Sequence, residues 1–293
     1  KEGKSVTEKS GTLYLCATPI GNLDDMTFRA VDTLKKVSLI AAEDTRHTRK
    51  LLSHFDIHVP ITSYHEHNKR SKGPELIAKL QDGQDIALVS DAGLPGISDP
   101  GEDLVQLALA EAITVTPIPG SNAALTALVA SGLPTGKFLF CGFLPKASAE
   151  RRNQIATLQS VSQTLVFYEA PHHVMRTIED LQKGLGDRKA VAARELTKIH
   201  EEFIRGTLSE LTAHFSVNRP RGEFTLLVAG GDMKQNDAET VSTGNAEVSD
   251  ADILQAVGKL MDMGKNKKDA IKMTASQLGL SRRRVYQLMI KAE

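Results

Sequence analysis

Short apolar runs alternate with amphipathic segments along the first part of the chain. The runs have the length and composition of buried strands, and they lie at 13–17, 37–42, 86–89 and 113–118. Apolar residues at helical spacing between them predict helices at 28–37, from Asp44 through Leu52, at 102–111 and at 122–130. Because strands that alternate with helices form βαβ units, we expect a largely parallel sheet.

The pattern changes beyond residue 135. Strands are predicted at 138–143, 164–168, 190–194 and 224–229, and helices at 148–159, 172–183 and 208–216. These elements indicate a second α/β domain. We therefore predict an N-terminal α/β domain at 11–120, a C-terminal α/β domain at 121–231, a polar linker at 232–248 and a small helical module at 249–293.

The segment 249–293 differs from the rest of the chain in charge and pattern. It holds nine Lys and Arg against five Asp and Glu, a local net charge of +4. Helices predicted at 250–263, 267–278 and 282–291 surround a Gly turn, with Ser281 as the expected cap of the last helix. This is the layout of a helix-turn-helix unit, and Arg282, Arg283 and Arg284 suit contacts with nucleic-acid phosphates. A solvated basic helix face is the alternative.

Composition bears on the kind of protein and on its location, but it does not identify a binding partner. The 36 Lys and Arg balance 36 Asp and Glu, so the formal net charge is 0 and only its local distribution bears on nucleic-acid binding. The polar start of the chain and the lack of a long apolar run predict a cytoplasmic protein without a membrane partner. Cys16 and Cys141 make no zinc site, and His65 and His67 lack a carboxylate cluster, so no metal is expected.

Two loops rich in Gly and Pro follow predicted strands, where open α/β sheets bind ligands. The loop 90–101 contains Asp91 and can bring bare backbone groups against a small ligand. The loop 117–122 leads into a helix that Ser121 is expected to cap. The alternative for the loop 90–101 is a long ordered turn without a function. The alternative for the loop 117–122 is that it only caps the helix. Neither a dinucleotide fingerprint nor a P-loop is present in the sequence.

Six sequence blocks, in order, resemble those of the tetrapyrrole methylase superfamily, and of its rRNA-modifying members in particular. They are Tyr14 to Asp25, Ala42 to Arg46, Ser90 to Gly101, Pro119 to Ala123, Phe167 to His172 and Arg194 to Lys198. The resemblance covers 11–231 and the helical tail. It implies the two-domain α/β fold of class III methyltransferases. The first loop, Thr18 to Asn22, lacks the G-x-G-x-G-D of many members that modify tetrapyrroles, which argues against a porphyrinoid substrate.

The resemblance also implies a methyl donor, S-adenosylmethionine, bound in a cleft that the C-terminal α/β domain closes. By position, the donor-binding residues are Ile20, Asp91, Gly93, Leu94, Gly96, Ile97, Ser121, Asn122, Tyr168, Ala193 and Thr225. The implied acceptor is the 2′-hydroxyl of a cytidine in the decoding region of 16S rRNA, within the small ribosomal subunit. A homodimer is implied, and no DNA partner.

A ribose hydroxyl is a poor nucleophile at neutral pH, so a nearby base is expected. The candidates are Asp44, Glu169, Glu195 and Lys198. Lys198 qualifies only if its pKa is depressed. Arg46 and Arg194 suit phosphate binding. Three of the candidate bases have another interpretation. Asp44 caps its helix, Glu169 pairs with Arg194, and Lys198 is a solvated charge at the end of a strand.

Two rival functions stay open at this point. The first is a methyltransferase of corrinoid biosynthesis, which shares the fold and donor and needs a large apolar trough. The second is a ligand-sensing regulator that binds nucleic acid through the tail as a two-fold dimer.

Overall fold

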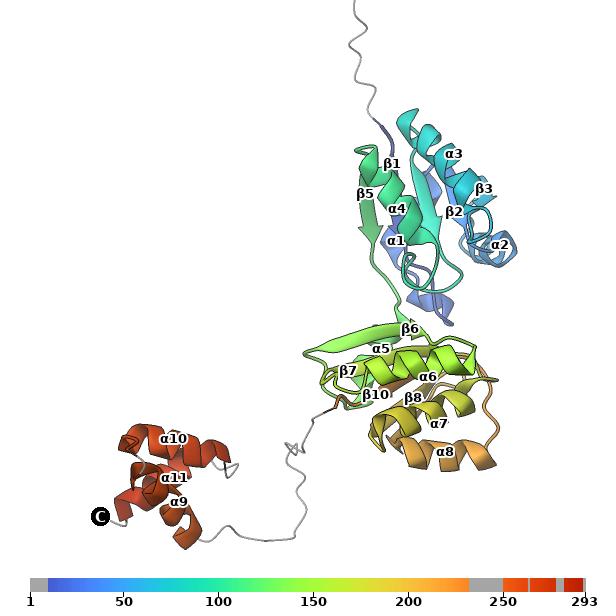
Figure 1. Ribbon diagram of the computed structural model, residues 1–293. Helices are drawn as coiled ribbons and strands as arrows, with labels where there is room; N and C mark the ends of the chain where they lie inside the picture. The colour runs from blue at the N-terminus through green and yellow to red at the C-terminus, as the bar shows by residue number, and fades with distance from the viewer. Residues whose placement is uncertain (1–9, 232–249, 263, 278–281, 292–293) are drawn as a thin grey trace, which may run out of the picture. The chain divides into compact units, whose positions relative to one another are not determined.

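The computed structural model describes residues 10–231, 250–262, 264–277 and 282–291. Its contacts divide the chain into two compact units, Lys1–Lys234 and Gln235–Glu293 (Figure 1). The first unit contains both sheets, and the second contains the helices of the tail. Among the described residues, no helix is both long and apolar enough to cross a membrane.

The first sheet has the order β3-β2-β4-β1-β5, and all its strand pairs are parallel. Its strands are β1 (Thr12–Cys16), β2 (Leu39–Ala42), β3 (Ile61–Ser63), β4 (Ile86–Val89) and β5 (Thr114–Ile118). Its connections contain η1 (Leu23–Asp25), α1 (Phe28–Lys36), α2 (Thr45–His54), α3 (Lys69–Gln81) and α4 (Gly101–Ala110). The predicted parallel sheet is confirmed. The strand β3 and the helix α3 were not predicted, because β3 is too short for a periodic signal and α3 contains Gly73 and Pro74.

Helices cover both faces of the first sheet. Along β1, Leu13 packs on one face with Leu76 of α3 and Leu104 of α4. Cys16 packs on the other face with side chains of α1 and α2. Successive side chains of a strand point to opposite faces, so a fully covered parallel sheet needs apolar residues at nearly every position. The polar loops are thereby confined to the strand ends.

The second sheet has the order β6-β7-β10-β8-β9 and is mixed, since β6 and β7 are parallel and the other pairs are antiparallel. Its strands are β6 (Phe138–Phe143), β7 (Thr164–Glu169), β8 (Lys189–Arg194), β9 (Glu202–Thr207) and β10 (Phe224–Val228). The helices are α5 (Ala123–Ser131), α6 (Ser148–Thr157), α7 (Val174–Leu185) and α8 (Leu208–Val217). The edge strand β9 was not predicted, and its partly exposed, charged sequence explains why.

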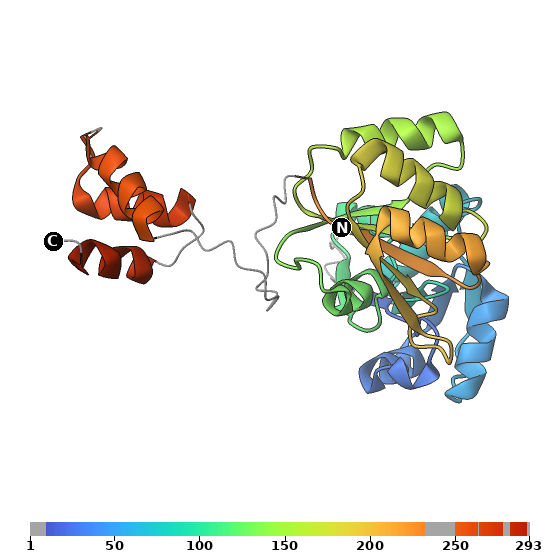
Figure 2. The ribbon, with the colours of Figure 1, turned by 90° about the horizontal axis from the view of Figure 1, so that it is seen from below.

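The helix α5 covers the opposite face of the second sheet from α6, α7 and α8, as Figure 2 shows by colour. The apolar cluster under α5 also contains Ile20, from the loop after β1, and Leu196, from the loop after β8. This cluster therefore joins the first loop of the chain to the second sheet. The predicted boundary at 120/121 falls between β5 and α5.

The second unit contains α9 (Asp250–Asp262), α10 (Lys267–Gln277) and α11 (Arg282–Lys291). Ile253, Val257, Ile271 and Val285 lie in its apolar core. Arg284, on α11, lies 3.6 Å from Asp250 of α9. The three predicted helices are present, whereas the predicted cap Ser281 and the predicted linker 232–248 lie outside the described residues.

Candidate functional site

A cavity of about 510 Å³ opens in the first unit where the loops after β1, β2 and β4 meet the second sheet. Its lining is made of Ile20, Glu43, Ser90, Asp91, Ala92, Gly93, Leu94, Ile97, Ser98, Asp99, Asn122, Ala123, Phe143, Tyr168, Glu169, Ala170, Pro171, Ala193, Leu196, Glu223, Phe224 and Thr225. The volume lies within the range of roughly 300–1,000 Å³ that is typical of small-molecule sites. Its position at the carboxyl ends of parallel strands is where open α/β sheets bind ligands.

The loop 90–101 is an ordered wall of this cavity. Gly93 exchanges two backbone hydrogen bonds with Thr18 of the first loop, at 2.9 and 3.0 Å. The carboxylate of Asp99 accepts from the N–H groups of Gly96 and Gly101, each at 2.8 Å. Gly93 and Gly96 have φ values of 82° and 89°, a backbone region that favours glycine. The glycines are therefore required by the shape of the loop.

Three of the carboxylates that line the cavity, Glu43, Asp91 and Asp99, lie close enough to interact electrostatically. Asp91 Oδ1 accepts from the backbone N–H of Asp44 at 3.0 Å, which ties the loop after β4 to the end of β2. Burial raises the pKa of Glu43, and the neighbouring Asp91 and Asp99 raise it further. Concentrated negative charge of this kind favours a ligand that carries positive charge.

The opposite wall comes from the second sheet. Thr225 of β10 lies in register between Tyr168 of β7 and Ala193 of β8, so the three form one row across the sheet. The hydroxyl of Tyr168 accepts from the N–H of Ala124 at 3.3 Å, and burial raises its pKa. The ring of Phe143 lies 5.6 Å from the ring of Tyr168. This wall offers the rings of Phe143, Tyr168 and Phe224 beside the carboxylates of Glu169 and Glu223.

Nine of the eleven predicted donor-binding residues line the cavity: Ile20, Asp91, Gly93, Leu94, Ile97, Asn122, Tyr168, Ala193 and Thr225. Gly96 and Ser121 are outside the lining. The prediction that Ser121 caps α5 is wrong. Asn122 is the N-cap, and its side-chain oxygen accepts from the N–H of Leu125 at 3.0 Å. Helix capping requires the residue immediately before the first helical position, which places the cap one residue later than predicted.

Asp44, a predicted base, is outside the lining and caps α2. Its carboxylate accepts from the side chain of Arg46 at 2.7 and 3.1 Å and from the Arg46 N–H at 2.8 Å. The side-chain bond to Arg46, followed by the backbone bond, holds the pKa of Asp44 well below its usual range. Arg46 is largely exposed beside the end of β2.

Glu169, another predicted base, is buried at the cavity wall. Its carboxylate accepts from the Thr177 hydroxyl at 2.5 Å and from the Ala170 N–H at 2.8 Å. The predicted pairing with Arg194 is wrong, because Arg194 forms its ion pair with Glu202 at 2.8 Å. Arg194 and Glu202 are paired across neighbouring antiparallel strands, and this register brings them together.

Glu195 and Lys198 form an ion pair outside the cavity lining, with Nζ of Lys198 2.9 Å from Glu195 Oε1 and 2.9 Å from Glu223 Oε2. Partial burial lowers the pKa of Lys198, but the two glutamates outweigh that effect and raise it overall. A lysine that acts as a base requires the opposite shift. Leu196, between them, faces the cavity instead.

Several lining residues were missed by sequence reasoning, among them Glu43, Asp99, Phe143 and Glu223. Glu43 had a usable signal, because it is the first residue after β2. Phe143 and Glu223 had none, since only the mixed sheet order brings their strands to the cavity. Within the described ranges, no group of His, Cys, Asp and Glu side chains is arranged to hold a metal ion.

The sequence and the fold of this chain are both similar to those of known methyltransferases and related proteins. A sequence model of the tetrapyrrole (corrin/porphyrin) methylases matches residues 12–212. The chain is 48% identical to the ribosomal RNA small subunit methyltransferase I of Halalkalibacterium halodurans, over 96% of this chain and 95% of that protein. It is 48% identical to the protein of the same name from Synechocystis sp., over 97% and 99%. The solved structure of a diphthine synthase shares the fold, with a TM-score of 0.60 at 12% identity, over 75% of this chain and 90% of that one.

Proposed function

The chain belongs to the tetrapyrrole (corrin/porphyrin) methylase family, and on that premise we propose that it is an S-adenosylmethionine-dependent methyltransferase of small-subunit ribosomal RNA. The predicted α/β fold of this family is confirmed. The full-length relatives named as rRNA methyltransferases extend beyond the region that the family model matches. Since their alignments cover 96–97% of the chain, they include most of the segment 249–293.

The observation that carries the proposal is a cavity that combines several carboxylates with the aromatic rings of the second sheet. S-adenosylmethionine has a cationic sulfonium and ammonium, ribose hydroxyls and an aromatic adenine. Glu43, Asp91 and Asp99 suit the cations and hydroxyls, and Phe143 and Tyr168 suit the ring. The nine predicted residues at the lining are assigned to donor binding. Gly96 supports the loop 90–101 through its hydrogen bond to Asp99, and Ser121 directly precedes the α5 cap Asn122.

The donor supplies an electrophilic methyl group on sulfur. In-line displacement needs the acceptor oxygen, the methyl carbon and the sulfur in one line, so the main task of the two walls is alignment. The acceptor hydroxyl must also lose its proton. Glu169 is the predicted base that lines the cavity, and Glu43 joins it as a carboxylate with a raised pKa. Asp44 instead caps α2 next to Glu43, and Glu195 and Lys198 hold the turn after β8.

We assign the acceptor to the 2′-hydroxyl of a cytidine in the decoding region of 16S rRNA, in the assembled small subunit. Arg46, Arg194 and the tail arginines at 282–284 are the proposed phosphate contacts. A homodimer is part of the proposal. Apolar side chains exposed on α5 and β6 support it, namely Leu125, Val129, Phe138 and Leu139.

The test is a transfer assay with methyl-labelled S-adenosylmethionine. Small ribosomal subunits and protein-free 16S rRNA, both from a strain lacking this protein, serve as acceptors. We expect label in a 2′-O-methylated cytidine, with subunits preferred over free rRNA. If the protein binds the donor but no RNA is labelled, the rRNA proposal fails and corrinoid intermediates become the acceptors to test.

Two matched variants show whether the cavity is the donor site. The carboxylates of Asp91 and Asp187 each accept from a backbone N–H, that of Asp44 at 3.0 Å and that of Ser209 at 2.8 Å. Only Asp91 lines the cavity. We expect Asp91→Asn to weaken donor binding about tenfold or more, and Asp187→Asn to leave it unchanged. Equal binding by both variants would contradict the assignment of the cavity.

A further inference from the structure

The turn between β8 and β9 has an unusual backbone. Glu195 and Thr197 both have positive φ values, 51° and 66°, although neither is glycine. Thr197 is also β-branched, which makes this region of backbone space particularly unfavourable for it. Such conformations persist when surrounding contacts hold them, and they are concentrated at functional sites. The turn 195–201 therefore calls for an account of what holds it and what it does.

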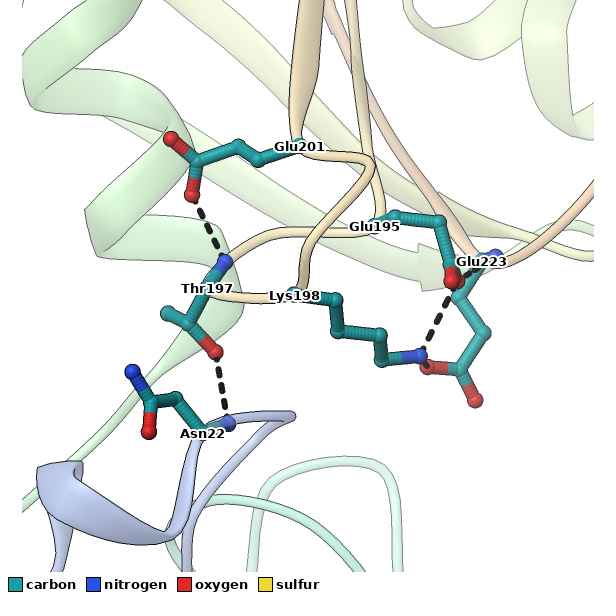
Figure 3. Close-up of polar contacts among 6 residues, drawn as sticks. All are labelled: Asn22, Glu195, Thr197, Lys198, Glu201 and Glu223. Carbon is teal, nitrogen blue, oxygen red and sulfur yellow. Dashed lines mark hydrogen bonds and ion pairs between the residues drawn. The ribbon is translucent and has the colours of Figure 1, made fainter.

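A set of polar contacts within the turn and with the start of β10 holds this backbone (Figure 3). Glu195 Oε1 accepts from Lys198 Nζ and from the N–H of Glu223, each at 2.9 Å. Glu201 Oε2 accepts from the N–H of Thr197 at 2.6 Å. The Glu195 side chain is only 19% exposed, so its bonds to Lys198 and Glu223 are partly shielded from water.

The same turn contacts the loop after β1, as Figure 3 also shows. Thr197 Oγ1 accepts from the N–H of Asn22 at 3.0 Å. Gly21 lies so close that an added Cβ would come within 2.5 Å of Lys198 Cγ and 2.9 Å of Thr197 Oγ1. Glycine at 21 and the hydroxyl at 197 thus allow two loops that are distant in sequence to pack together.

This contact lies directly behind two residues of the cavity wall. Ile20 precedes Gly21, and Leu196 precedes Thr197; both side chains line the cavity and share one apolar cluster with Ala193. The loop of Ile20 belongs to the first sheet, and Leu196 follows the second sheet. The spacing of these two walls therefore depends on how Thr197 meets Asn22.

We propose that Thr197 is a positioning residue for the methyl donor: its hydroxyl fixes the loop of Ile20 against the turn of Leu196 and so sets the width of the cavity. This inference rests on the proposed function, since it assumes that the cavity binds the donor. Thr197 itself does not line the cavity and acts through its neighbours. The Glu195–Lys198 ion pair keeps the turn in the shape that presents the hydroxyl to Asn22.

The experiment compares Thr197→Val with Thr197→Ser in the full chain, by calorimetric titration with S-adenosylmethionine and by transfer to small subunits. Valine keeps the shape and removes the acceptor, whereas serine keeps the acceptor. We expect Thr197→Val to raise the Kd and the KM for the donor about three- to tenfold, the scale of one lost hydrogen bond at a partly exposed site, with kcat at saturating donor nearly unchanged. Thr197→Ser should retain the wild-type Kd, KM and kcat.

A second pair of variants separates positioning from stability. Thr207 ends β9 and caps α8 through its hydroxyl, away from the cavity lining. Thr207→Val should lower the melting temperature and leave the Kd for the donor unchanged. Gly21→Ala, which forces the two loops apart, should raise that Kd more than Thr197→Val does.

The outcomes separate the inference from the function on which it rests. If the wild-type chain does not bind S-adenosylmethionine, the proposed function fails. If the wild type binds and Thr197→Val binds equally well, the proposed function stands and the positioning role is wrong. A change of Kd shared by Thr197→Val and Thr207→Val would also overturn it, because loss of stability would then explain both.

Discussion

At the scale of single residues, Glu43 is expected to link stability to function. Burial, then Asp91 and Asp99, place the pKa of Glu43 in the folded chain above its value of about 4.3 in the unfolded chain. Ionising Glu43 therefore costs folding free energy at a pH above the folded pKa, and this cost is absent below the unfolded pKa. We expect Glu43→Gln to have two effects. The first is a larger free energy of unfolding at about pH 7, with little change at about pH 4. The second is slower methyl transfer. Urea denaturation at both pH values measures the first effect.

Glu75 provides the control with the opposite sign. Its hydrogen bond from Lys72 lowers the pKa of this exposed carboxyl. Its contribution is stabilising above the unfolded pKa and is lost as the pH falls through the folded value. Glu75→Gln should therefore destabilise slightly, if at all, at about pH 7 and leave methyl transfer intact. If Glu43→Gln destabilised the fold at neutral pH in the same way, the account of Glu43 would be wrong.

At the scale of elements, the helix cap Asn122 is expected to have a second role, in donor binding, beside the stabilising role that every helix cap has. Asn122 caps α5 and lines the cavity, whereas Thr27 caps α1 by accepting from the N–H of Ala30 at 3.1 Å. Asn122→Ala and Thr27→Ala should each lower the free energy of unfolding by about 1 kcal/mol. Only Asn122→Ala should also weaken donor binding. Thermal unfolding with and without S-adenosylmethionine separates the two effects, and an equal ligand-induced stabilisation of both variants would exclude a donor-binding role for Asn122.

At the scale of the whole molecule, the tail is expected to supply affinity for RNA rather than chemistry. Replacing Arg282, Arg283 and Arg284 together by alanine should weaken binding to small subunits. A plot of the logarithm of the binding constant against the logarithm of the salt concentration should become less steep, its slope falling in magnitude by about two. The KM for the donor should stay the same. Because Arg284 also lies near Asp250, helix content must be compared by circular dichroism. An unchanged salt dependence, with the helices intact, would leave the tail without a phosphate-binding role.

Most elements of the first sheet could be predicted because each carries its own local signal, β3 and α3 excepted. Continuous apolar runs such as 86–89 become strands buried on both faces, and Asp44 is recognisable as a cap before α2. The glycines of the loop 90–101 follow from backbone geometry alone, as Gly93 and Gly96 show. Loop positions after strands likewise pointed to the loop 90–101 as part of the cavity wall.

Contacts between distant residues could not be predicted in this way. The partner of Arg194 is Glu202 because of the β8–β9 register, and β9 itself carries no clear pattern. The turn 195–201 meets Asn22 across a sequence separation of 175 residues. The amino-acid sequence by itself therefore determined most of the strand-and-helix order and the glycine-rich loop at the cavity, since propensity, periodicity and glycine geometry are local, and its six blocks carried the resemblance to the family. Only the tertiary structure decided which carboxylates face the cavity and which are held in ion pairs, because burial and charge neighbours depend on how the two sheets meet.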